Sequence, residues 1–155
     1  MEVKGTNYLI PVDAKLTSEH DLGFETISAD EVMSTMSGAR ALRVLILDAC
    51  RDNPFAATMQ LTDKTRAVSR GLARIEQPTD GSLIVYSARP GQLALDGDGP
   101  NSPFASALAR RLTEPNVEIL KLFRLVRDDV LALTNQQQQV FEDNSLPAKD
   151  FFFKQ

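Results

Sequence analysis

The chain has few of the residues on which metal sites and disulfide frameworks depend. Its 155 residues include one cysteine, one histidine and no tryptophan. A single cysteine excludes a disulfide within the chain, and one cysteine with one histidine gives no zinc-ligand cluster. Cysteine usage therefore does not identify the redox compartment, and the sequence leaves the localisation open.

Long apolar runs and an excess of positive charge are also missing. No stretch approaches the ~20 apolar residues of a membrane helix, and the first residues, MEVKGTNY, lack the apolar core of a signal peptide. The net charge of −4 leaves no basic face to neutralise phosphates, which argues against a general nucleic-acid-binding protein. The composition is that of an ordinary soluble chain, and residues 1–155 are long enough for one domain.

Two short apolar runs predict the core strands of an α/β fold. Residues 42–47 and 83–86 are nearly continuously apolar, as is typical of strands buried on both faces of a parallel sheet. Helix signals surround them, including a capping box at Ser28 and Glu31 and a first-turn proline at Pro103. The predicted helices cover residues 28–36, 102–112 and 117–133.

Three other segments are less regular. Residues 53–70 lack a clear period and predict a long polar loop, which in a compact domain is usually functional or disordered. The glutamine run 136–139 is interpreted as a solvated linker. Residues 151–153, three phenylalanines, predict a last strand or a hydrophobic clasp.

Reactive side chains gather where the first apolar strand ends, in the sequence DACRDNP. Catalytic groups of open α/β sheets lie at the carboxyl ends of strands, so the thiol of Cys50 is well placed for chemistry. The alternative is a buried cysteine that acts as a small hydrophobe. Asp48 and Cys50 can face the same side because side chains alternate along a strand. The Asp48 carboxylate can then bind a basic group, or it caps a nearby turn.

Several ordered motifs make the chain resemble the bacterial caspase-like cysteine peptidases of the caspase and metacaspase clan (peptidase family C14). The likeness runs from Asn7 to Phe153. Its motifs are DACRDNPF, GLARI, SLIVYSARPGQLALDGDGPNSPFASAL and the terminal DFFF. The resemblance implies a caspase-like α/β fold, with a mostly parallel sheet and flanking helices, and a peptide or protein substrate. It makes Cys50 the nucleophile of an endopeptidase.

The resemblance also implies a specificity. Metacaspases that cleave after Arg or Lys carry Asp where caspases proper carry Gln, so Asp48 implies a basic P1 residue. The serine that matches Ser87 lines the primary specificity pocket of metacaspases. A basic preference, together with the long polar loop, predicts self-cleavage near three basic residues of that loop: Lys64, Arg66 and Arg70.

In these peptidases the general-base histidine sits in a His-Gly pair just upstream of the segment that matches Met1 to Tyr8. We therefore expect the N-terminal strands and this pair to be missing, and the chain alone to be inactive. His20, in TSEHDLGF, is expected to be an exposed loop residue or a local cap. The alternative function is a non-catalytic module that binds peptides or partners. Without its neighbour, strand 42–47 would be an edge that favours a homo-oligomer.

No cofactor is predicted. Some metacaspases need calcium, but the stretch Asp96-Gly97-Asp98-Gly99 lacks the ligand spacing and terminal Glu of an EF-hand loop. Glycine and aspartate at these positions predict a turn instead.

Overall fold

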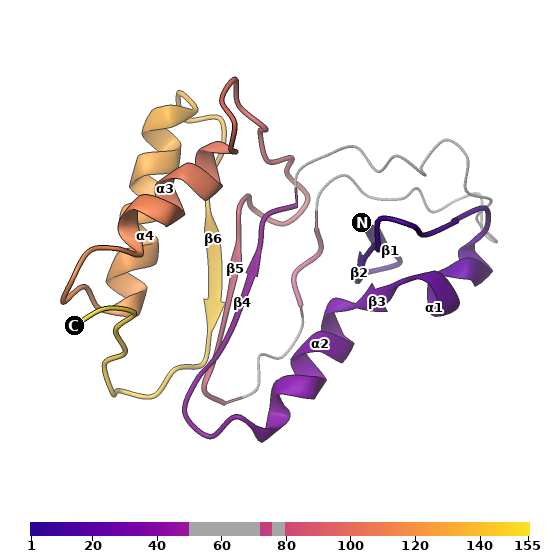
Figure 1. Cartoon of the computed structure of the whole chain (residues 1–155), viewed down its shortest axis with the longest axis horizontal. Coiled ribbons are helices and arrows are strands. Elements are labelled where there is room, and N and C mark those ends of the chain that lie inside the picture. Colours follow the sequence, from indigo (N-terminus) through magenta and orange to yellow (C-terminus); the bar gives the residue numbers. More distant parts are fainter. Residues whose placement is uncertain (50–71, 76–79) are drawn as a thin grey trace.

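A mixed three-stranded sheet forms the centre of the molecule (Figure 1), a computed structural model that describes residues 1–49, 72–75 and 80–155. Its strands, in spatial order, are β4 (Arg43–Leu47), β5 (Ser82–Tyr86) and β6 (Phe141–Asn144). The pair β4–β5 is parallel and the pair β5–β6 is antiparallel. The two predicted strands are thus confirmed, whereas β6 was not predicted.

Helices cover both faces of this sheet. The helices α3 (Pro103–Arg111) and α4 (Ile119–Leu133) pack on one face, and α2 (Ala29–Thr35) lies on the other (Figure 1). The alternation of side chains along β5 explains both layers. Leu83 and Val85 belong to the core cluster with α3 and α4, while Ile84 and Tyr86 belong to the cluster with α2.

The helix ends follow their sequence signals. Ser28 and Glu31 form the predicted capping box of α2, and the Ala105 N–H donates to Ser102 Oγ at 2.9 Å at the start of α3. These contacts satisfy backbone donors that the first helical turn leaves unpaired. All three predicted helices are therefore confirmed, with ends shifted by one or two residues.

A bidentate ion pair joins α3 to α4. Arg111 donates from Nε to Asp129 Oδ2 at 2.6 Å and from Nη2 to Oδ1 at 2.8 Å. Its hydrogen bonds lower the pKa of the Asp129 carboxyl. In the core cluster of α3, α4 and the sheet, Phe104 and Phe123 are each 1% exposed, and full burial of such a side chain stabilises the fold by about 1.5–3 kcal/mol.

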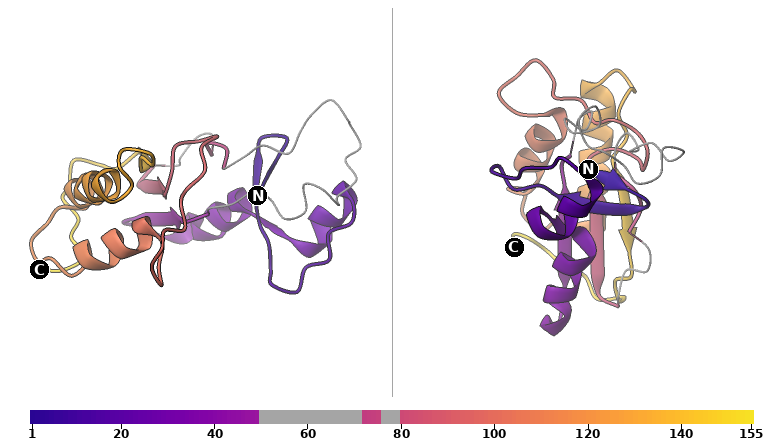
Figure 2. Two further views of the ribbon diagram at one scale, coloured as in Figure 1. Left: turned by 90° about the horizontal axis from the view of Figure 1, so that it is seen from above. Right: turned by 90° about the vertical axis from the view of Figure 1, so that its right-hand side faces the viewer.

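The N-terminal elements lie beyond α2, towards the opposite end of the long axis from α3 and α4 (Figures 1 and 2). They are β1 (Glu2–Val3), β2 (Thr6–Leu9), η1 (Glu19–Asp21), α1 (Leu22–Glu25) and β3 (Ile27–Ser28), and the short η2 (Met36–Gly38) follows α2. The strands form an antiparallel sheet in the order β1-β2-β3. The Asn7 side chain exchanges two hydrogen bonds with the Ala73 backbone, of 2.6 and 2.8 Å, which tie this sheet to residues 72–75.

Two C-terminal segments test the remaining expectations. The clasp is formed only in part, because Phe151 packs against the core cluster whereas Phe152 and Phe153 are exposed. Phe152 makes an isolated bridge with Glu118, and the centre of the Phe153 ring lies 6.4 Å from that of Phe123 in an edge-on arrangement. The glutamine run is not a uniformly solvated linker, because Gln138 is only 1% exposed. The linker interpretation was wrong at this residue, since its amide is used inside the fold. The predicted loop 53–70 lies outside the described residues.

Candidate active site

The carboxyl ends of β4 and β5 meet at one edge of the central sheet. Leu47 is paired with Tyr86, and the Ser87 N–H donates to the Leu47 carbonyl at 2.9 Å. The parallel pairing therefore continues past the strands and puts Asp48 and Ser87 next to each other. This edge is where open α/β sheets bind ligands.

Asp48 is exposed, and its Oδ2 accepts a hydrogen bond from the Ser102 hydroxyl at 2.6 Å. The same hydroxyl caps α3, so Asp48 orients a capping group rather than capping a helix itself. A carboxylate offers about four acceptor positions. The Ser102 hydroxyl uses one of these positions.

Ser87 lies deeper, with 2% of its surface exposed. Its carbonyl accepts a hydrogen bond from Gln138 Nε2 at 2.8 Å. The Oε1 atom of the same amide accepts from the Leu95 N–H, also at 2.8 Å, and the Gln138 N–H donates to Thr134 Oγ1 at 3.1 Å. Gln138 therefore fixes three segments together: the end of β5, the loop that carries Leu95 and the end of α4.

Sequence reasoning missed Gln138. One glutamine of four in a row gives no signal of its own, and its partners Ser87 and Leu95 lie 51 and 43 residues away. Both the oxygen and the nitrogen of its side-chain amide have a hydrogen-bond partner. A polar group that is hydrogen-bonded in this way can be buried with little loss of free energy.

Most of the other predicted site residues cannot be compared with this edge. Cys50, Lys64, Arg66 and Arg70 lie outside the described residues. His20 is exposed in η1, as expected for a residue without a core role. Its neighbour Asp21 forms the local cap instead, and backbone hydrogen bonds from Thr17 and Ser18 lower the pKa of Asp21 to about 2.

The stretch Asp96–Gly99 is irregular: the chain bends from Asp98 on, without a hydrogen-bonded turn. Gly97 has a φ of +72°, a conformation that favours glycine. Across residues 1–49, 72–75 and 80–155, no group of three or more His, Cys, Asp or Glu side chains could hold a metal ion. The helices within these ranges are all too short or too polar to cross a membrane.

Comparison with known proteins identifies the family of the chain. The model of the peptidase C14 caspase domain matches residues 1–152. The chain belongs to the caspase domain family. Among curated proteins, no sequence matches the chain.

Solved structures agree on the fold. Caspase-1 from Spodoptera frugiperda superimposes with a TM-score of 0.55 at 18% identity, over 84% of this chain and 55% of the caspase. A structure of pro-sf-caspase-1 gives a TM-score of 0.54 at 19% identity, over 84% of this chain and 57% of that chain. The predicted caspase-like α/β fold is confirmed, and the chain spans little more than half the length of these caspases.

Proposed function

We propose that this caspase domain is the nucleophile-bearing part of a cysteine endopeptidase that cleaves after Arg or Lys. The observation that carries the proposal is the shared edge at the ends of β4 and β5, where Asp48 and Ser87 are neighbours. Cys50 follows Asp48 by two residues in the sequence. Membership of the caspase domain family supports a protein substrate.

In the proposed reaction the Cys50 thiolate attacks the carbonyl carbon of the scissile peptide bond. The C–N bond then breaks, the amine leaves with a proton from the general base, and water hydrolyses the resulting thioester. Negative charge develops on the carbonyl oxygen, and the backbone N–H of Cys50 is the donor we assign to it.

Asp48 supplies the specificity. An exposed carboxylate at this edge attracts the guanidinium or ammonium group of a P1 residue, and Ser87 forms part of the pocket wall. Both roles are the ones that the resemblance to metacaspases implies, in contrast to caspases that cleave after Asp. The same preference would direct self-cleavage to Lys64, Arg66 and Arg70.

A second candidate function is a non-catalytic module that binds basic peptides. It is favoured by the scarcity of histidine, because the sequence has one histidine, His20, and its side chain is exposed in η1. A thiol without a paired base is a weak nucleophile near neutral pH. We therefore expect the 155-residue chain alone to show no significant turnover.

The test uses fluorogenic peptides with Arg, Lys or Asp at P1. The 155-residue chain is compared with a form encoded together with upstream sequence that carries a His-Gly pair, each with a Cys50→Ala control. We expect cleavage after Arg and Lys, dependent on Cys50, in the extended form only. Strong Cys50-dependent turnover by the chain alone would overturn the expected inactivity and point to His20 as the base.

Two matched variants separate specificity from helix capping. Asp48→Asn removes the charge but keeps an acceptor for Ser102, and should abolish most of the preference for Arg over uncharged residues. Ser102→Ala removes the hydrogen bond and keeps the charge, so the preference should remain. Self-cleavage solely after Asp, detected by mass spectrometry, would contradict the proposed specificity.

A further inference from the structure

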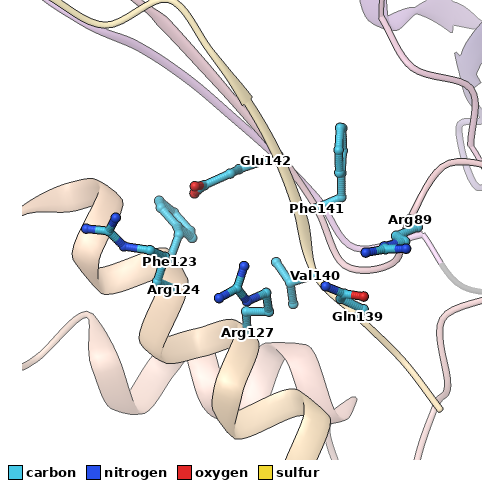
Figure 3. Close-up of a pocket in the computed structure, with 8 residues that line it drawn as sticks. All are labelled: Arg89, Phe123, Arg124, Arg127, Gln139, Val140, Phe141 and Glu142. Carbon is cyan, nitrogen blue, oxygen red and sulfur yellow. The ribbon is translucent and has the colours of Figure 1, made fainter. Parts of the chain in front are cut away.

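A pocket of about 220 Å³ lies between α4 and β6 (Figure 3). β5 separates β6, which lines this pocket, from β4, which leads to Asp48. The pocket is smaller than the ~300–1,000 Å³ of sites for drug-sized ligands, so it suits a small chemical group. Asp48 and Ser87, the proposed peptidase residues that the structure describes, do not line it.

The pocket is rich in arginine. Arg124 and Arg127 project from α4, three residues apart, and Arg89 approaches from the segment after β5 (Figure 3). One carboxylate, that of Glu142, is among the lining groups. With Glu142 ionised, three guanidinium groups and one carboxylate give the described residues of the pocket walls a net charge of +2.

The positive charges of these arginines are only weakly neutralised by carboxylates among the residues that the structure describes. Arg127 Nε lies 3.7 Å from the neighbouring Asp128 carboxylate, too far for a hydrogen bond. Neither Arg124 nor Arg89 forms an ion pair with a carboxylate in the described ranges. Salt bridges elsewhere in the molecule are much closer, such as the 2.6 Å contact of Arg111 with Asp129.

Two polar atoms of the pocket are buried without a hydrogen-bond partner, Arg127 Nε and Glu142 Oε2. Burial raises the pKa of Glu142, while Arg124 and Arg127 act in the opposite direction. Buried unsatisfied groups are uncommon in folded proteins and call for a bound species or water. A ligand that accepts hydrogen bonds from Arg127 would remove part of this cost.

We propose that this pocket binds a phosphate dianion, either free inorganic phosphate or the phosphoryl group of a phosphomonoester. The planar forks of arginine match phosphate oxygens in bidentate geometry, and the Gln139 amide offers another donor. A net wall charge of +2 fits a dianion better than a carboxylate ligand, which carries a single charge. Phe123 and Val140 form an apolar wall that reduces competition from water. The Phe141 ring points to the other face of the sheet, where it packs against Tyr86 (Figure 3).

The experiment is an NMR titration of the 155-residue chain with inorganic phosphate at constant ionic strength and pH 7.5. We expect saturable shifts of the Arg127 Nε–H and Gln139 amide signals, with sulfate also binding and acetate binding at least about tenfold more weakly. A phosphoserine peptide and its unphosphorylated form make up a second arm. Tighter binding of the phosphopeptide than of free phosphate assigns the site to a phosphomonoester, and the reverse assigns it to inorganic phosphate.

Matched variants test the residues. Arg124→Gln and Arg127→Gln should each weaken phosphate binding about tenfold, whereas Glu142→Gln should tighten it several-fold because a like charge is removed. Lys121→Gln is the control, since it removes the same charge from an exposed position of α4 outside the pocket, and it should change binding less than about twofold.

Equal losses in Lys121→Gln and the arginine variants would overturn the proposal in favour of a general electrostatic effect. Non-saturable shifts, or equal binding of acetate and phosphate, would also overturn it. Circular dichroism verifies folding, and Arg124→Lys, which keeps the charge but not the fork, should fall between the wild type and Arg124→Gln. No arm measures peptidase activity, so the outcome is independent of the proposed reaction.

Discussion

The strands β4 and β5 have similar apolar sequences, RVLIL and SLIVY, but different environments. Every residue of β5 is at most 1% exposed. In β4 only Leu47 is buried, at 6%, and the other four residues are half-buried. β5 has strand neighbours on both sides, whereas β4, in the ranges that the structure describes, pairs only with β5.

The difference shows that position in the sheet, more than apolar content, determines burial here. Both faces of β5 are covered, by α3 and α4 on one side and by α2 on the other. β4 shares these faces only in part. The candidate site joins the ends of the two strands, so Asp48 follows the more exposed strand and Ser87 the fully buried one.

The largest effect is expected from truncating the same residue type in the two strands. Val85 and Val44 both pack against the cluster formed with α3 and α4, but Val85 is fully buried. Val85→Ala should lower the free energy of unfolding by about 2–3 kcal/mol, through lost burial and a cavity. Val44→Ala should lower it by about half as much.

Urea unfolding of both variants measures the two free energies under identical conditions. Equal losses would show that β4 is as well covered as β5, and the contrast between the strands would then fail.

Local signals predicted much of this architecture. The capping box of Ser28 and Glu31, the first-turn Pro103 and the spacing of apolar residues in α4 depend on neighbours within one or two helical turns. Sequence alone therefore located α2, α3 and α4, but not the one-turn α1. The apolar runs located β4 and β5 for the same reason.

Contacts between distant residues could not be predicted. The strand β6 has the polar sequence FEDN and forms because β5 offers it backbone partners. Ser102 reaches Asp48 across 54 residues, and no sequence period encodes that contact. The arginine pocket likewise joins α4 to β6 and to the segment after β5. Resemblance to a family marked Asp48 and Ser87, whereas Gln138 required the structure.

A smaller effect is expected from the hydrogen bonds of Gln138, which hold the end of β5. Gln138→Met keeps the shape of the side chain but leaves the Ser87 carbonyl and the Leu95 N–H without their partner. We expect a loss of about 2 kcal/mol in the free energy of unfolding. Gln137→Met, at an exposed neighbouring position, should be close to neutral.

Hydrogen exchange adds a local readout. The Leu95 N–H should exchange faster in Gln138→Met than in the wild type, and at the wild-type rate in Gln137→Met. Unaltered Leu95 protection in Gln138→Met would show that the loop is held by other contacts.

In the described residues β4 is the outer strand of the central sheet, with β5 as its one strand neighbour. We expect self-association through the other side of β4, because an edge strand favours pairing with another chain. Val44→Lys places a charge on the strand and should raise the dissociation constant of a dimer about tenfold, or ~1.4 kcal/mol. Val44→Ala is the control for lost packing. Light scattering over a dilution series gives the constants. A stable monomer whose residues 42–47 are protected from hydrogen exchange would contradict this expectation.

The smallest effect concerns β6, the other neighbour of β5. Burial raises the pKa of the Glu142 carboxyl, so its neutral form is favoured in the folded state. The charges of Arg124 and Arg127 lower this pKa, and the charge of Glu118 raises it, but burial is the largest influence. The stabilising contribution is therefore complete below the ordinary pKa of a glutamate, and it is lost as the pH rises through the higher pKa of the folded state. Glu142→Gln has no carboxyl to titrate and so does not undergo this loss of stability. The free energy of unfolding of the variant relative to the wild type should therefore increase from about pH 4 to pH 7. Thermal unfolding in phosphate-free buffer measures the difference, and a constant difference across this range would show that Glu142 titrates as it does in the unfolded chain.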